Sequence, residues 1–167
     1  AKFSPIMNEI IGFANAGGYV MGICNGFQIL CESGLLPGAL LHNTNHKFIC
    51  KNVYLKTISD NTIVTNMIGE FPIKIPIAHG EGRYFASKET IQDLESNDQI
   101  LFKYCDESGE ITDSSNPNGS IENIAGVCNK DRNVFGMMPH PERAADIELN
   151  STNGRKLFES ILSKVIA

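Results

Sequence analysis

A cysteine flanked by glycines is the residue best suited to chemistry in this sequence. Gly22, Cys24 and Gly26 form the pattern G-x-C-x-G, which follows a short apolar run and precedes a helical pattern. This is the thiol counterpart of the nucleophile elbow, a tight strand-to-helix turn that lifts a nucleophile above the end of a sheet. The N-terminus of the following helix favours the thiolate, and the backbone N–H of Asn25 can donate to a developing oxyanion. We therefore expect Cys24 to be a catalytic nucleophile; the alternative is a structural cysteine buried in a glycine-flanked turn.

A thiol nucleophile needs a base, and His140 is the strongest candidate among the four histidines. It directly follows a predicted strand, and Pro139 and Pro141 restrict the backbone on both sides of it. Glu142 lies two residues further on, where its carboxylate can face the same way and hold the imidazole by one ring nitrogen. Cys24, His140 and Glu142 therefore predict a triad of nucleophile, base and orienting carboxylate.

The other three histidines are weaker candidates for a functional role. His79 lies in a glycine-rich turn, residues 78–82, whose backbone can approach a ligand closely; a plain surface turn is the alternative. His42, His46 and Cys50 are spaced by four residues, but the asparagine-rich stretch around them is a poor helix and has no neighbouring carboxylate. We predict no metal site. The sequence also contains neither a phosphate-binding loop for ATP nor a dinucleotide fingerprint.

Composition limits the class of protein. The 167 residues, 42% of them hydrophobic, suffice for one globular domain with a real core. The net charge of −5 argues against a nucleic-acid partner, which normally requires a basic face. No apolar run approaches the ~20 residues of a membrane span, and we expect no signal peptide. Five cysteines, none spaced as C-x-x-C, indicate reduced thiols and a cytoplasmic location.

Helical and strand patterns alternate along the chain and must position these residues. The first helical pattern begins after Ser4, with Pro5 in its first turn, and stops at Gly17. Stretches 35–47 and 106–120 read as loops. The mixture predicts an α/β protein with a partly parallel sheet. The predicted strands are 19–23, 48–55, 62–67, 73–78, 99–105, 124–128 and 134–138, and the later helices 26–33, 88–96 and 157–165.

In combination, these segments resemble the triad-type (class I) glutamine amidotransferases. Residues 22–28 and 137–143, which hold the predicted triad, carry the resemblance. It narrows to the glutaminase subunits of phosphoribosylformylglycinamidine synthases through four further segments: residues 3–7, 34–40, 78–82 and 116–120. The resemblance implies a flavodoxin-like three-layer sandwich with a mixed, partly parallel central sheet, built as one glutamine amidotransferase domain over residues 1–167.

The resemblance also implies a reaction. The Cys24 thiolate would attack the carboxamide of glutamine, His140 would carry the protons, and Glu142 would orient His140. Water would hydrolyse the resulting glutamyl-thioester to glutamate. The implied substrate-binding residues are Asn25, Gly26, Gln28 and His79.

The implied partners are a large synthetase subunit and a small bridging subunit of the same complex. The synthetase would use the ammonia to convert formylglycinamide ribonucleotide to the amidine in purine biosynthesis. ATP and Mg would be used by that synthetase, and this chain would bind no cofactor of its own.

Members of the family begin with a further stretch of about sixty residues, about the first third of the domain, that is absent from this sequence. That stretch contains the first strands and a glycine-rich loop that supplies half of the oxyanion hole. We therefore expect an incomplete sheet whose apolar surface faces water or a partner beside the elbow. We also expect the 167-residue chain alone to be a poor glutaminase.

Two other functions stay open from the sequence. A thiol hydrolase of the same architecture would act on another amide or on a γ-glutamyl peptide. A non-catalytic interaction module would retain the triad as a relict, but a relict site usually loses at least one member. All three members are present here, at Cys24, His140 and Glu142.

Overall fold

The computed structural model describes residues 4–165, so Phe3 of the amino-terminal motif lies outside the described residues. The elements of the first half are α1 (Pro5–Asn15), β1 (Val20–Ile23), α2 (Asn25–Glu32), β2 (Ala39–Leu41), β3 (Ile49–Thr57), β4 (Ile73–His79) and β5 (Arg83–Phe85). Those of the second half are α3 (Lys88–Ser96), β6 (Ile100–Cys105), η1 (Asp113–Ser115), η2 (Ile121–Asn123), β7 (Ile124–Cys128), β8 (Val134–Met137), η3 (Pro141–Ala144), η4 (Ile147–Leu149) and α4 (Arg155–Val165).

The central sheet has six strands in the order β1-β8-β7-β6-β3-β4. β1 and β8 are parallel, with Ile23 beside Met137, and all other neighbours are antiparallel. Strands β2 and β5 form a separate antiparallel ribbon. The mixed, partly parallel sheet expected from the sequence is therefore confirmed, with its parallel part confined to the pair β1–β8.

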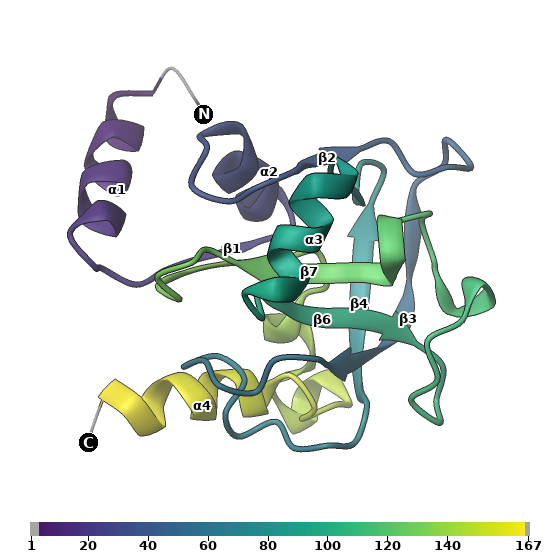
Figure 1. The fold of residues 1–167 in the computed structure, drawn as a ribbon. Helices are drawn as coiled ribbons and strands as arrows, with labels where there is room; N and C mark the ends of the chain where they lie inside the picture. Colours follow the sequence, from purple (N-terminus) through teal and green to yellow (C-terminus); the bar gives the residue numbers. More distant parts are fainter. Residues whose placement is uncertain (1–3, 166–167) are drawn as a thin grey trace.

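Two apolar cores lie on the two faces of the sheet, which gives the three layers seen in Figure 1. Alternate residues of one strand enter different cores because side chains of a strand point to opposite faces. Along β8 and the residue after it, for example, Val134 and Met138 join the core of α2 and α3, whereas Phe135 and Met137 join the core that includes Leu157 of α4. The helices therefore cover the two faces of the sheet.

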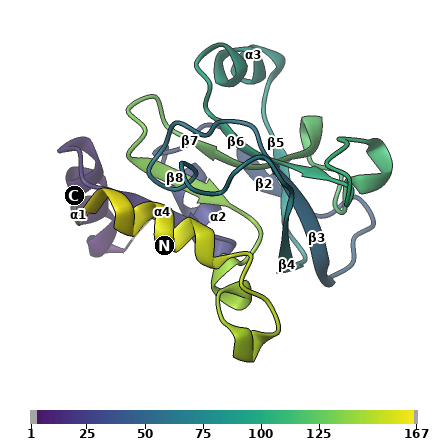
Figure 2. The same ribbon diagram turned by 90° about the horizontal axis from the view of Figure 1, so that it is seen from below.

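The sheet curls until the outer edge of β4 meets the segment that follows β8. The backbone N–H of His140 donates to the carbonyl of Pro76 in β4, with an N–O distance of 2.8 Å. Pro76 suits this edge because it has no N–H to leave unpaired. Figure 2 shows β3 and β4 standing across the other strands, with the segment after β8 beside them. Edge strand β4 and the segment after β8, four places away in the sheet order, are thus brought side by side.

The strand predicted over 62–67 is wrong. These residues form turns, in which the Thr62 and Thr65 hydroxyls lie 2.7 Å apart and the N–H of Ile68 donates to the carbonyl of Thr65. Val64 and Ile68 are buried in the core, four residues apart, so the apolar pattern reflects burial of a turn instead of pairing in a sheet. Local hydroxyl-to-backbone bonds compete with strand pairing at such threonines.

Two short strands, β2 and β5, were absent from the sequence-based prediction. Each has only three residues, and each lies next to a glycine- or histidine-rich turn that dominates the local pattern. Their pairing places the loop 35–47 against the turn 79–82. The remaining predicted helices and strands are confirmed, with ends that shift by one or a few residues.

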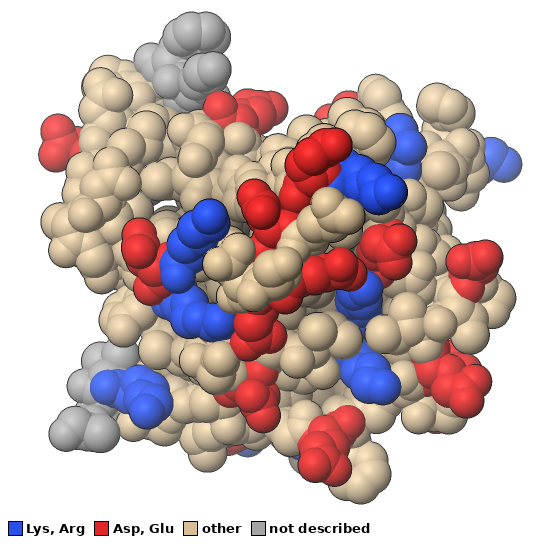
Figure 3. Space-filling model, in the orientation of Figure 1, with Lys and Arg blue, Asp and Glu red and all other residues tan. Residues whose placement is uncertain are grey.

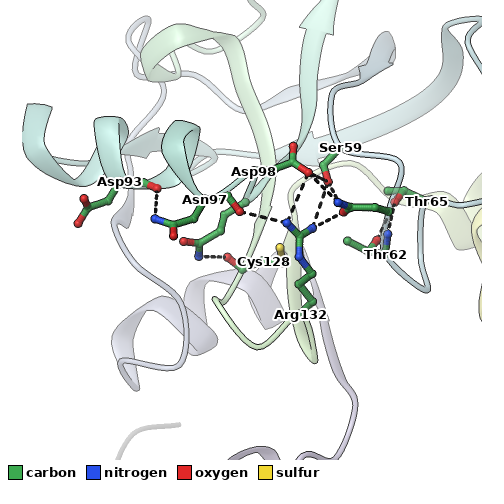
Figure 4. A network of polar contacts seen from close by, with 10 residues as sticks. Ser59, Thr62, Thr65, Asp93, Asn97, Asp98, Cys128 and Arg132 are labelled. Atoms are coloured by element: carbon green, nitrogen blue, oxygen red, sulfur yellow. Dashed lines mark hydrogen bonds and ion pairs between the residues drawn. The ribbon is translucent and has the colours of Figure 1, made fainter.

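Arg132, in the turn before β8, ties together three loops (Figure 4). Its guanidinium donates to the Asn97 carbonyl at 3.1 Å and lies 3.4 Å from an oxygen of Asp98. It also donates to the side chains of Ser59 and Asn61. A single side chain therefore fixes the turn before β8 against the loop that follows β3 and the end of α3.

Edge strand β1 pairs within the described residues only with β8, which leaves its other edge open. A mainly apolar groove of about 360 Å³ lies between this edge, α1 and α2, and its lining includes Met7, Met21 and Leu30. The surface over α1 is largely uncharged in Figure 3, whereas acidic and basic side chains intermingle elsewhere on that face. No helix in the described part of the chain is long and apolar enough to cross a membrane.

Candidate active site

The predicted elbow is present, with Cys24 at its apex between β1 and α2. Cys24 has φ 53° and ψ −108°, a positive φ that non-glycine residues rarely adopt and that costs on the order of 1–3 kcal/mol. Its N–H donates to the carbonyl of Met137 at 2.8 Å, so the elbow continues the β1–β8 pairing by one residue. The strained turn carries the thiol beyond the ends of the two parallel strands, where ligands of open α/β sheets bind.

The two glycines of the elbow differ in their importance for packing. A Cβ added to Gly22 would lie 2.6 Å from the carbonyl carbon and oxygen of Gly26 and from Cδ1 of Leu30. A Cβ added to Gly26 would meet nothing within 4 Å. The turn therefore requires a glycine before Cys24, whereas the position after it is open among the described residues.

His140 and Glu142 are joined as predicted. Nδ1 of His140 lies 2.6 Å from Oε1 of Glu142, and the His140 side chain is 9% exposed. The carboxylate accepts at Nδ1, so Nε2 carries the lone pair of the neutral imidazole. That Nε2 is buried and has no hydrogen-bond partner among the described residues. It is the atom left free to take a proton.

The Cys24 thiol lies at the outer edge of β4. Its sulfur is 3.9 Å from the carbonyl oxygen of Ala78. Burial raises the pKa of Cys24, the Asn25 N–H and the Arg143 charge lower it, and the Glu142 charge raises it. Because burial is the largest of these causes, the resting thiol is protonated at neutral pH and needs a base to react.

Arg143, which sequence reasoning did not single out, belongs to this site. Its Nε lies 3.5 Å from Oε1 of Glu142, the oxygen that also holds His140. Because its charge also lowers the pKa of Cys24, Arg143 acts on both the nucleophile and the orienting carboxylate of the predicted triad. The sequence indicates this role only in that Arg143 directly follows Glu142 within residues 137–143.

His79 is buried below the surface, with 4% of its area exposed. Its Nδ1 is 3.0 Å from Oδ1 of Asn43, whose amide nitrogen donates to the carbonyls of Lys47 and His79. Those two bonds fix the amide orientation, so Oδ1 accepts and Nδ1 of His79 donates. Burial lowers the pKa of His79 to about 4, and its Nε2 is a second buried imidazole nitrogen without a hydrogen-bond partner within residues 4–165.

Gln28 joins the elbow helix to the glycine-rich turn. Its Nε2 donates to the carbonyl of Glu81 at 2.6 Å. Gly82 is required in this turn because an added Cβ would lie 2.3 Å from the His79 ring. Asn25, Gln28 and Glu81 also line a cavity of about 360 Å³ beside the start of α2. The four predicted substrate-binding residues therefore come from only two segments, the start of α2 and the end of β4.

The histidines considered as metal ligands form a different contact. Nε2 of His42 lies 3.3 Å from Oε1 of Glu81, and the His42 and His46 ring centroids are 6.3 Å apart. Cys50 is exposed on β3. In the described residues, no group of three or more His, Cys, Asp and Glu is arranged to hold a metal ion.

Comparison with known proteins agrees with this geometry. Residues 2–163 match the CobB/CobQ-like glutamine amidotransferase domain family. Two relatives, from Chlorobium luteolum and Synechocystis, are each described as "Phosphoribosylformylglycinamidine synthase subunit PurQ". They are 51% and 56% identical over 99% and 96% of this chain. The chain belongs to the PurQ family of glutamine amidotransferases.

A solved structure extends the comparison to the fold. It is titled "Structure of PurLQS from Thermotoga maritima", and its matching chain has a TM-score of 0.84 at 43% identity over 98% of this chain. This chain spans 70% of that chain and 72% of each of the two sequence relatives. The PurQ family thus accounts for the α/β architecture predicted from the sequence.

The elbow makes a paired prediction about stability. Gly22→Ala should lower the free energy of unfolding by about 1–3 kcal/mol, because its Cβ would overlap the Gly26 backbone. Gly26→Ala should leave it unchanged or raise it by up to about 1 kcal/mol, because alanine favours the helix and meets no neighbour. Urea unfolding of both variants measures the difference, and equal losses would contradict the packing described for the turn.

Neutral His79 makes a prediction about pH. The pKa is about 4 in the folded chain and about 6.5 when unfolded, so the unfolded state binds the proton first as the pH falls. The contribution that neutral His79 makes to stability is complete above about pH 6.5 and is lost progressively as the pH falls from 6.5 to 4. Between pH 7 and 4.5 the histidine should therefore cost the native state about 2–3 kcal/mol.

The matched variant is His79→Gln, which cannot titrate. Carboxylates affect both proteins alike, so urea unfolding at the two pH values isolates the histidine. The wild-type protein should lose more stability on acidification than the variant. Equal losses would show that His79 is not held neutral.

Proposed function

We propose that this chain is the glutaminase subunit of a phosphoribosylformylglycinamidine synthase and releases ammonia from glutamine through a Cys24 thioester. The proposal is supported by three groups that lie near one end of the sheet. They are the strained Cys24, the buried free Nε2 of His140, and the Glu142 carboxylate that orients it. Cys24 is hydrogen-bonded to the end of β8, and the charges of Glu142 and Arg143, shortly after β8, act on its thiol. Membership of the PurQ family supplies the substrate class.

Acylation begins with proton transfer. His140 takes the Cys24 proton at Nε2, and the sulfur attacks the carboxamide carbon of glutamine, which places negative charge on the amide oxygen. The Asn25 N–H points toward the sulfur and is suitably placed to donate to that oxygen. Glu142 stabilises the imidazolium through Nδ1. His140 then gives its proton to the departing nitrogen, and ammonia leaves.

Deacylation uses the same groups in the reverse order. His140 removes a proton from water, and the resulting hydroxide attacks the thioester carbon. The carbon–sulfur bond breaks, Cys24 recovers a proton from His140, and glutamate leaves. The balance is glutamine and water to glutamate and ammonia.

Substrate binding in this proposal uses Asn25, Gly26, Gln28 and His79. Gln28 holds the turn 79–82 against α2, and Gly26 leaves its side of the elbow open for an incoming group. The Nε2 of His79 is a fixed acceptor, so it can receive a hydrogen bond from an amide or ammonium group. Acceptors and donors from the two segments would hold glutamine with its carboxamide at Cys24.

The ammonia would be used by a synthetase subunit of the same complex, with a small bridging subunit completing the assembly. The Thermotoga structure, by its title, contains PurL, PurQ and PurS together. ATP and Mg would act on the synthetase side, because this chain carries no phosphate-binding loop in its sequence.

A glutamine-mimicking electrophile should label Cys24 covalently, and Cys24→Ala should abolish the label. Because burial raises the pKa of Cys24, labelling should increase as the pH rises from 7 to 9. Intact-mass and peptide mass spectrometry measure both results.

Cys31→Ala is the control and should label normally, because burial raises the pKa of Cys31 to about 12. Labelling of Cys31 in place of Cys24 would contradict the proposal. A panel of glutamine, asparagine and γ-glutamyl dipeptides, assayed for release of ammonia or amine, distinguishes the glutaminase from a thiol hydrolase of other specificity.

A further inference from the structure

A small lobe follows the proposed triad and contains η4. Residues 145–151, the η4 lobe, project beyond the sheet where the yellow-green segment leaves the body in Figure 2. The lobe is closed by a bridge between Asp146 and Ser151. Its turn is capped by the Asp146 side chain, which accepts from the N–H of Glu148 at 3.0 Å, and it ends on Asn150 in the left-handed conformation.

The base of the lobe is fixed to the rest of the protein. Arg155 at the start of α4 donates from Nε to the carbonyl of Ala145 at 2.9 Å and pairs with Asp146 at 3.5 Å. The N–H of Gly154 donates to the carbonyl of Ala144 at 2.7 Å. Residue 154 must be glycine, because a Cβ there would lie 2.1 Å from the carbonyl oxygen of Pro141. These contacts anchor the base of the lobe to the start of α4 and the segment after the lobe to η3.

The anchored lobe presents two large apolar side chains to solvent. Ile147 is 78% exposed and Leu149 is 49% exposed, whereas Leu157 of the adjacent helix is fully buried. Single exposed apolar residues are common on protein surfaces. Here a capped and bridged turn holds two of them outward. They are preorganised for a partner, because little conformational entropy is lost when they bind.

The lobe is also continuous with the reaction site. Glu142, which holds His140, lies five residues before Ile147, and its side chain is 44% exposed beside Arg143. Ammonia released at His140 is small and is lost to water unless its consumer covers this side of the site. A partner seated on the lobe would lie over Glu142 and Arg143 as well.

We propose that the η4 lobe is the docking knob for the ammonia-consuming synthetase subunit, an inference that rests on the proposed function. Ile147 and Leu149 would enter an apolar cleft of that subunit. Glu148 is exposed between them and the neighbouring Asp146 is also acidic, so the rim of the cleft should be basic. Central apolar anchors with a charged rim are the usual anatomy of a protein interface.

The test compares two variants in the assembled complex. Ile147→Asp combined with Leu149→Asp should weaken binding to the synthetase by at least about tenfold and reduce glutamine-dependent amidine formation in parallel. Amidine formation with added ammonium salt, which bypasses this chain, should not change. Leu162→Asp, on the outer surface of α4 with a side chain 53% exposed, is the matched control and should bind as the wild-type protein does.

Each other result overturns the inference. Unchanged affinity of the lobe variant, or an equal loss in Leu162→Asp, would show that the lobe does not dock. If the wild-type chain formed dimers and the lobe variant did not, the partner bound at the lobe would be a second copy of this chain and not the synthetase. Ile147→Ser is a milder variant that should show the same direction if the double variant fails to fold. Cys24 labelling distinguishes a failure of this inference from a failure of the proposed function. Absence of labelling in the wild-type protein would refute the proposed function. A lobe variant that is still labelled at Cys24 and still binds the synthetase would refute only this inference.

Discussion

The hydrogen bond from the His140 N–H to the Pro76 carbonyl joins edge strand β4 to the segment that follows β8, the neighbour of the opposite edge strand, and the geometry of the site depends on it. β1 and β4 are opposite edges in the strand order, yet Cys24 follows β1 and its sulfur faces the carbonyl of Ala78 in β4. Only a curled sheet can bring the end of β1 and the edge of β4 together at one site. An apolar core lies on each face of this curled sheet.

The site itself is unfavourable for stability. Cys24 adopts a strained positive φ, and two buried imidazole nitrogens, on His79 and His140, have no hydrogen-bond partner in the described part of the chain. Each such unsatisfied group costs on the order of 1–3 kcal/mol, and it persists only where the surroundings determine the geometry. In this chain the surroundings are backbone carbonyls of β4, the Asn43 amide and the Glu142 carboxylate. A buried acceptor without a partner is also the feature that a substrate or a transferred proton can satisfy.

Local patterns predicted the parts of the site that depend on residue type. Cys24 between glycines and His140 between prolines are unusual enough in sequence to be identified without the fold. The contributions of Pro76 and Ala78 could not be predicted, because backbone carbonyls leave no trace in residue type and their position follows from the curl. Asn43 was equally hidden, since its partner His79 is 36 residues away and an asparagine-rich stretch reads as a loop. The turn at 62–67 was mistaken for a strand because threonine and apolar residues favour both.

Amide hydrogen exchange at His140 tests most directly whether closure of the sheet forms the site. The N–H of Met138 donates to Ala125 within the sheet and serves as the internal reference. If the account is correct, the His140 N–H exchanges as slowly as that of Met138, because both open only when the sheet opens. Fast exchange at His140 with continued protection at Met138 would show that β4 and the segment after β8 are not held together, and would contradict the account.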